Sequence, residues 1–384
     1  MTFTTLSTDE HDMLRDAART FAQRELNPGT QRQRRGQNPP FDPATWQAMA
    51  AMGWTGLLIE EPLGGAGAGL QAFCTVLSEL GRALPAEPLV ACGVLATVAI
   101  QGSDNTALRE PLLRGIAAGH ELPALAQEPA SRGASGVRAR RHMAGRWLLD
   151  GELRFARPGH GATGHLVLAG TPDGPALFWL RHGLAGVSTT HEMLTDGSDA
   201  AQLVLTGVAL SDAELLVPPG RATAVVQRAV DAALIATAAE LLGLMRAVFE
   251  QALDYLRTRR QFGVAIGSFQ ALQHRAVDLH IQHELTSALV ERASRLYDEG
   301  SAELSMVAAH AKARAADAAQ HTVREAMQFH GAMGYTDECD IGLYLKRSLS
   351  LAAWLGNPSE QRKRYAALRF PIATTTTTST TAVS

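Results

Sequence analysis

Hydrophobic and polar positions divide this chain into three parts that differ in their period. Over residues 1–120 apolar side chains recur every three or four positions, starting after a capping box that begins at Ser7. Residues 121–217 hold short runs of strand-forming residues separated by turns. Helical spacing returns over residues 218–370, and the threonine-rich tail, residues 371–384, has no apolar face and is predicted to be disordered. We therefore predict a mostly α member of the α+β class, with an N-terminal helical domain, a small central β domain and a C-terminal four-helix bundle.

The same pattern predicts individual elements. Two short apolar runs between Trp147 and Phe155 flank Asp150 and Gly151, a pair of residues that favours the tight turn of a β-hairpin. Apolar residues from Val226 onwards keep helical spacing long enough for one helix of roughly 30 residues. Other helices are expected at residues 71–81, 91–118, 268–298, 303–330 and 358–368, and other strands at 165–170, 176–181 and 202–210.

Composition narrows the classes of function. The formal net charge is −3 over 384 residues, which provides no basic surface for nucleic acid. Three widely spaced cysteines form neither a metal-ligand pattern nor a disulfide framework, and this fits a reducing cytoplasm. No apolar run is judged long enough to cross a bilayer, and the N-terminus lacks the features of a secretory signal. His280 and His283 lie one helical turn apart without a third ligand, so we interpret them as a solvated helix face and predict no metal site.

Two segments of the last third carry groups suited to a nucleotide. The first, residues 255–279, combines arginines, a Phe-Gly pair and a Phe-Gln pair. A guanidinium can hold a pyrophosphate through two parallel hydrogen bonds, and an amide can bond a purine edge or a ribose. The second is Gln328–Tyr335, which is rich in glycine. The alternative interpretation is structural: basic residues favour the negative end of a helix, and Gly331 could simply end one.

Together with residues 52–88 and 124–170, these segments resemble the acyl-CoA dehydrogenase family over about residues 50–370. The resemblance implies FAD, not FMN or NAD, with its adenosine half reached from a neighbouring subunit. Gln127 stands where the family often has threonine, Phe155 where it often has tryptophan, and Arg157 replaces a threonine that usually bonds the flavin. The cofactor-binding residues implied in this way are Arg259, Gln261, Phe262, Phe269, Gln270, Gln328, Gly331, Ala332, Asn357, Gln127 and Phe155.

The resemblance also implies a reaction. Such an oxidoreductase desaturates a thioester between its α and β carbons, and hydride leaves for flavin N5. The expected substrate is an acyl-CoA or an acyl-carrier-protein thioester, and electron-transfer flavoprotein is the expected electron acceptor. Because the adenosine site of the family is built across subunits, we expect a homo- or hetero-oligomer, most simply a tetramer or a dimer of dimers.

The usual catalytic base is missing from the positions where the resemblance places it. Leu355 or Gly356 stands at the family's common glutamate, and the alternative site on the long helix falls near Ala233. None of these side chains can take a proton. Glu240 lies seven residues beyond Ala233, about two turns along the same helix face, and is the candidate base. The alternative interpretation is a buried or capped structural glutamate.

Three functions remain open at this point. One is an active dehydrogenase that uses Glu240 or a base from a different subunit. Another is a non-catalytic FAD-binding partner of a heteromeric dehydrogenase. The third is a related flavin oxidase or monooxygenase.

Overall fold

The computed structural model describes residues 3–4, 6–34, 36–129, 136–143 and 145–370. The tail predicted to be disordered, residues 371–384, lies outside the described residues.

The N-terminal part is built from helices. The capping box of the first helix is confirmed: the backbone N–H of Glu10 donates to Ser7 Oγ, and the backbone N–H of Ser7 donates to the Glu10 carboxylate. The helix expected over residues 91–118 is wrong as a single element. It is divided because Gly102–Asn105 intervene, with Asn105 capping the following helix. The helices are α1 (Thr8–Glu25), α2 (Pro28–Arg34), α3 (Pro43–Ala51), α4 (Gly69–Leu80), the π-helical Val90–Ala96, α5 (Thr97–Gln101) and α6 (Thr106–Ala117).

The central part is a mainly antiparallel sheet with its own hydrophobic core. Its strand order is β7-β8-β4-β3-β5-β6-β9, while β1 pairs in parallel with β5 and β2 pairs with β4. The strands are β1 (Pro123–Ala126), β2 (Glu128–Pro129), β3 (Val137–Met143), β4 (Arg146–Ala156), β5 (Gly164–Thr171), β6 (Gly174–Arg181), β7 (Val187–Met193), β8 (Asp199–Ser211) and β9 (Leu215–Val217).

The hairpin predicted at Asp150 and Gly151 is wrong, because these residues lie in the middle of the continuous strand β4. The Asp150 carboxylate accepts a hydrogen bond from the backbone N–H of Gly207 on β8, at 2.7 Å. Gly151 has φ 138° and sits at an irregularity in the β4–β8 pairing. A Cβ on Gly151 would lie 2.4 Å from the carbonyl oxygen of Gly136. Glycine is therefore needed here because the neighbouring chain approaches closely, and not because the chain turns.

The C-terminal part is a bundle of long helices. It contains α7 (Ala222–Thr258), the small hairpin β10 (Arg260–Gln261) and β11 (Val264–Ala265), α8 (Gln270–Asp298), α9 (Leu304–His330), α10 (Ile341–Ala353) and α11 (Pro358–Arg369). The sequence pattern did not predict α10. The sequence analysis also predicted that no apolar run is long enough to cross a membrane. That prediction is wrong for α7, which is long and apolar enough by length and composition. Its apolar stretch is 89% buried inside the protein, as expected for the central helix of a bundle.

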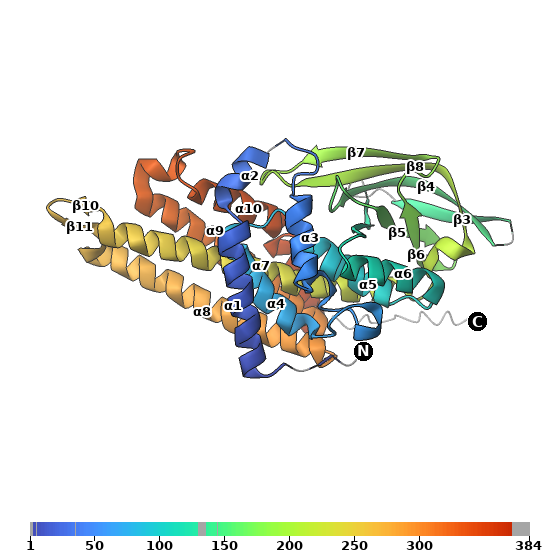
Figure 1. The fold of residues 1–384 in the computed structure, drawn as a ribbon, viewed down its shortest axis with the longest axis horizontal. Helices are drawn as coiled ribbons and strands as arrows, with labels where there is room; N and C mark the ends of the chain where they lie inside the picture. The colour runs from blue at the N-terminus through green and yellow to red at the C-terminus, as the bar shows by residue number, and fades with distance from the viewer. Residues whose placement is uncertain (1–2, 5, 35, 130–135, 144, 371–384) are drawn as a thin grey trace, which may run out of the picture.

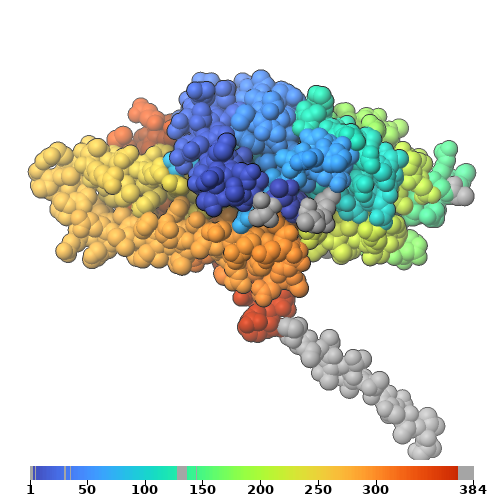
Figure 2. Space-filling model, turned by 60° about the horizontal axis from the view of Figure 1, so that its bottom comes forward, coloured from blue at the N-terminus to red at the C-terminus, as the bar shows by residue number. Residues whose placement is uncertain are grey.

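The three parts lie along one long axis. Figure 1 shows the sheet at one end and the tips of α7 and α8, joined by the β10–β11 hairpin, at the other. The N-terminal helices lie between these ends and cover the middle of one face, as the blue surface in Figure 2 shows. The helices share one hydrophobic core that runs through this middle region. The arrangement leaves the β10–β11 hairpin far from the sheet.

Candidate active site and cofactor contacts

The nucleotide-type residues of the first segment gather on the exposed tip between α7 and α8. Phe262 and Gly263 form the turn of the β10–β11 hairpin with φ of 53° and 83°. Phe262 is 91% exposed, and its ring meets Phe269 edge-on with centroids 6.2 Å apart. Two exposed aromatic rings beside the exposed Arg259 form a surface that favours contact with a ligand or another chain. Gln261 and Gln270 are exposed on the same tip.

The second segment lies beside this tip, at the end of α9. Gln328 is exposed, and α9 ends at Gly331, which has φ 61° and open space where a Cβ would lie. Ala332 follows on the surface. The rings of Tyr255 and His330 stack with centroids 4.1 Å apart, so the two segments lie side by side. The chemistry of this combined surface, a guanidinium with several amides and aromatic rings, fits the pyrophosphate and adenosine of a dinucleotide.

The residues expected at the flavin ring lie elsewhere, between the sheet and the loop after α10. Gln127 and Phe155 line a cavity of about 10 Å³ together with Arg157, Trp354 and Leu355. Phe155 is 39% exposed and has φ 61°, with the Arg154 guanidinium 5.2 Å from its ring centre. These side chains form a partly open aromatic and polar surface that could face a flavin.

Asn357 has a local role. Its side-chain oxygen accepts hydrogen bonds from the backbone N–H groups of Ser359 and Glu360 and caps α11. That oxygen is therefore engaged within the chain.

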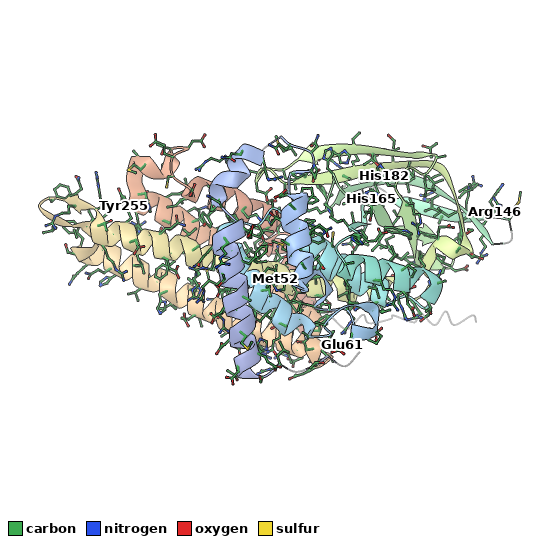
Figure 3. The ribbon with its side chains drawn as sticks, viewed as in Figure 1. Met52, Glu61, Arg146, His165, His182 and Tyr255 are labelled. Atoms are coloured by element: carbon green, nitrogen blue, oxygen red, sulfur yellow. The ribbon has the colours of Figure 1, made fainter. Side chains whose placement is uncertain are left out.

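The two groups of residues predicted to bind the cofactor lie on different parts of the chain. In Figure 3 Tyr255 marks the end with the arginine and phenylalanine group, whereas His165 and Arg146 mark the sheet at the opposite end. Gln127 and Phe155 belong to the sheet region. By their chemistry, the residues at the α7–α8 tip suit the pyrophosphate and adenosine of a dinucleotide, and those beside the sheet suit a flavin ring.

Glu240 lies at the centre of a buried ionic cluster. It is on α7, and its Oε1 accepts hydrogen bonds from Arg347 Nε and Nη2 at 2.8 and 2.5 Å. Arg347 Nη1 donates to Asp196, in the β7–β8 turn, at 2.9 Å. Among the described residues, none donates a hydrogen bond to Glu240 Oε2. Glu240 and Arg347 line a cavity of about 50 Å³ that also contacts Phe41, Arg157 and Trp354.

Burial and charge act in opposite directions within this cluster. Burial raises the pKa of Glu240 above its ordinary value, and Arg347 only partly opposes this. Burial also works against the charge of Asp196, but Arg347 and Arg157 outweigh it and hold the Asp196 pKa below its ordinary value. Burial disfavours charged Arg347 as well, yet the two carboxylates raise its pKa, so the guanidinium stays charged. Of the two carboxylates, Glu240 and Asp196, it is therefore Glu240 that takes up a proton more easily.

The residues at the family's two base positions lie in the loop after α10 and in the middle of α7. Leu355 lies in the loop between α10 and α11, with φ 58°, and Gly356 follows with φ 98°. Ala233 is fully buried in α7. Trp354 and Arg157 line both small cavities, whereas Glu240 lines one of them and Leu355 the other.

Comparison with known protein families matches both helical parts. The model of the acyl-CoA dehydrogenase N-terminal domain matches residues 8–120, and that of the C-terminal domain matches residues 221–367. The chain belongs to the acyl-CoA dehydrogenase family. It is an acyl-CoA dehydrogenase-like oxidoreductase acting on CH–CH donors, and its cofactor is FAD.

Relatives in the family match nearly the whole chain. Acyl-CoA dehydrogenase IpdE2 of Mycobacterium tuberculosis is 29% identical over 360 residues, covering 93% of this chain and 96% of the relative. Among solved structures, a variant of the Tcur3481–Tcur3483 steroid ACAD is 28% identical with a TM-score of 0.85, covering 94% of this chain and 98% of that one. The ChsE4–ChsE5 complex from Mycobacterium tuberculosis is 25% identical with a TM-score of 0.88, covering 97% of this chain and 100% of that one.

Sequence reasoning for this acyl-CoA dehydrogenase family member missed Arg347, Asp196 and Lys312. Arg347 lies on α10, and the one available signal was a basic pair inside the apolar stretch from Ile341 to Trp354. Asp196 was not predicted because it lies in a turn, and aspartate is common in turns for structural reasons alone. A larger cavity of about 560 Å³, between α1, α4, α7 and α8, is lined by none of the predicted site residues.

Proposed function

We propose that this protein is an acyl-thioester α,β-dehydrogenase whose FAD is held between two chains and whose α-proton acceptor is Glu240. The observation that supports the proposal is that the residues expected to bind FAD form two groups, one on the exposed α7–α8 tip and the other between the sheet and the loop after α10. Arg259, Gln261 and Gln270 would hold the pyrophosphate and adenosine of the FAD whose flavin faces Gln127 and Phe155 of another chain. When bound, the flavin supplies a hydride acceptor at N5.

Glu240 suits proton abstraction in three respects. Its Oε1 is fixed by two hydrogen bonds from Arg347, which leaves Oε2 to face a substrate. It lines a cavity whose other walls include the apolar Phe41, Leu351 and Trp354. Burial raises its pKa above the ordinary value for a glutamate, and a raised pKa makes a carboxylate a stronger base. Arg347 would keep the carboxylate oriented in both protonation states.

The second candidate is a subunit that depends on a different chain for the base. The observation in its favour is the side chain at the family's base position: Leu355 or Gly356 stands there, and Leu355 and Glu240 line different cavities. Two of the similar solved structures carry paired names, Tcur3481–Tcur3483 and ChsE4–ChsE5, and the latter is described as a complex. In this case Glu240 would only balance Arg347.

We further propose a cytoplasmic oligomer that takes its substrate as an acyl-CoA or an acyl-carrier-protein thioester. Electron-transfer flavoprotein is the acceptor we would test first. The family reaction leaves a reduced flavin, and a flavin carrier in the same compartment is the simplest oxidant for it.

The test is anaerobic bleaching of the flavin by a panel of acyl-CoA and acyl-carrier-protein thioesters. Glu240→Gln should slow bleaching by about 100-fold or more, the scale of a lost general base. Asp231→Asn is the matched control, because Asp231 is another buried carboxylate of α7, paired with Arg364. Full activity of Glu240→Gln would exclude Glu240 as the base. An inactive wild-type homomer that gains activity with a co-expressed homologue would favour the second candidate.

A further inference from the structure

Lys312 is a fully buried amine in the middle of α9. Its Nζ donates hydrogen bonds to the backbone carbonyl oxygens of Ala352, Trp354 and Gly356, at 3.0, 3.1 and 3.4 Å. An ammonium group has three protons, so each proton finds one acceptor. The first two carbonyls belong to the C-terminal end of α10, where a cation is favoured by the helix dipole.

The same loop is held from its other side by Gln361. Its Nε2 donates to the carbonyl of Leu355 at 2.6 Å, so two side chains bind the carbonyls of Trp354, Leu355 and Gly356 in succession. Leu355 has φ 58°, a conformation that a branched side chain rarely adopts without support. The Lys312 and Gln361 hydrogen bonds provide that support.

Residues of this loop, together with Arg157 from the sheet, line the two small cavities. Trp354 contacts both of them and lies under the Arg157 guanidinium, 5.1 Å from its ring centre. Leu355 lines the cavity that holds Gln127 and Phe155. We propose that Lys312 is a positioning residue, whose ammonium group fixes residues 354–356 and thereby the wall that separates the Glu240 cavity from the Phe155 cavity. Its consequence for catalysis rests on the proposed function, whereas its effect on the loop does not.

The charge of Lys312 is finely balanced. Burial lowers its pKa to about 7; Arg157, from the sheet, also lowers it, and Glu360, on α11, raises it. Loss of one proton leaves two donors for three carbonyls and turns a lone pair toward one of them. The loop should therefore be held less firmly as the pH rises through about 7.

Hydrogen–deuterium exchange of the amides of residues 353–357 tests the proposal in the full-length protein without substrate. Lys312→Met keeps the length of the side chain and removes the donors, and should speed exchange of these amides by about tenfold or more. Lys312→Arg keeps the charge and should recover part of the protection. Thr322→Val is the control, because Thr322 is also buried on α9 but donates to Ala318 within the helix.

The pH profile separates positioning from a general loss of stability. After correction for intrinsic exchange, protection of residues 353–357 in the wild type should fall between about pH 6 and pH 8. Lys312→Met should show no such step. The proposal is overturned if the variant protects the loop as the wild type does, or if all helices lose protection equally. It is also overturned if the wild-type profile is flat, a result that needs no variant to fold.

Discussion

Arg347 is the residue whose replacement we expect to be most destabilising in the buried cluster. Arg347→Met would leave Glu240 and Asp196 buried beside each other without the guanidinium that donates hydrogen bonds to both, and loss of one partner of a buried pair costs about 3–5 kcal/mol. Chemical denaturation measures the change in the free energy of unfolding. Arg362→Gln is the control, because its pair with Asp317 is more than half exposed and should contribute no more than about 1 kcal/mol.

Adding Glu240→Gln and Asp196→Asn to Arg347→Met should recover part of the lost stability, because the unpaired charges disappear. Equal losses for Arg347→Met and Arg362→Gln would contradict the importance of the cluster.

His165 gives the protein a predictable sensitivity to acid. It lies buried in β5, its Nε2 has no hydrogen-bond partner among the described residues, and burial lowers its pKa from 6.5 to about 4. The unfolded chain therefore takes up this proton at a higher pH than the folded protein does. Stability should fall as the pH drops from about 6.5 to about 4, by up to about 3 kcal/mol from this residue.

His165→Leu should flatten that part of the pH–stability profile, measured by denaturation at several pH values. The exposed His120 provides the control, because its charge does not contribute to the His165 shift: His120→Gln should leave the acid-induced loss in place. An unchanged slope in His165→Leu would show that other groups cause it.

Strand β4 depends on a glycine that the sequence pattern assigned to a turn. Gly151→Ala should destabilise the protein by more than about 1 kcal/mol, since its φ is unfavourable for alanine and its Cβ would strike the Gly136 carbonyl. Gly207→Ala, on the paired strand β8, isolates the backbone contribution, because Gly207 also has a positive φ but open space around its Cβ. The two variants are compared by their denaturation midpoints, and a larger loss for Gly207→Ala would refute the steric explanation.

At the scale of the whole molecule, sharing of FAD between chains can be tested by complementation. Arg259→Ala should weaken FAD binding by about 10- to 100-fold, the effect of a charge-assisted hydrogen bond. Phe155→Asp should damage the opposite half of the site. When the two variants are refolded together, a mixed dimer holds one site with both halves intact, so about a quarter of all sites should bind FAD.

Fluorescence titration of the mixture with FAD provides the measurement, and each variant alone is the control. No recovery would mean that the two halves of the site belong to one chain. The same lack of recovery is expected if the second chain of the site is a different protein. Co-expression with a homologue distinguishes these two explanations.

Local information was sufficient for much of this molecule. The capping box at Ser7 and the helices α7, α8, α9 and α11 follow from spacing and capping, which act within a few residues. The residues proposed to bind the cofactor at the α7–α8 tip could be grouped from the sequence because they are close together in it, and the structure shows them exposed on that tip. The proposed domain boundaries at 120 and 217 and the role of Glu240 stay predictions. Helix α10 was not predicted because its apolar face is short and is interrupted by Arg347. The carboxylate partners of Arg347 are distant in sequence.

By itself the sequence determined the mostly α fold, the family and the identity of the cofactor as FAD. These depend on periodic apolar positions and on motifs whose residues are contiguous in sequence. Only the tertiary structure decided what Glu240, Gly151 and Lys312 contact. Glu240 is joined to Arg347 across 107 positions and Lys312 to Trp354 across 42, and no local pattern encodes such pairings. Gly151 became a strand residue because a neighbouring strand approaches too closely for a Cβ. The physical reason is the same in each case: the free energy of a buried charge or a close backbone contact depends on what the fold places beside it.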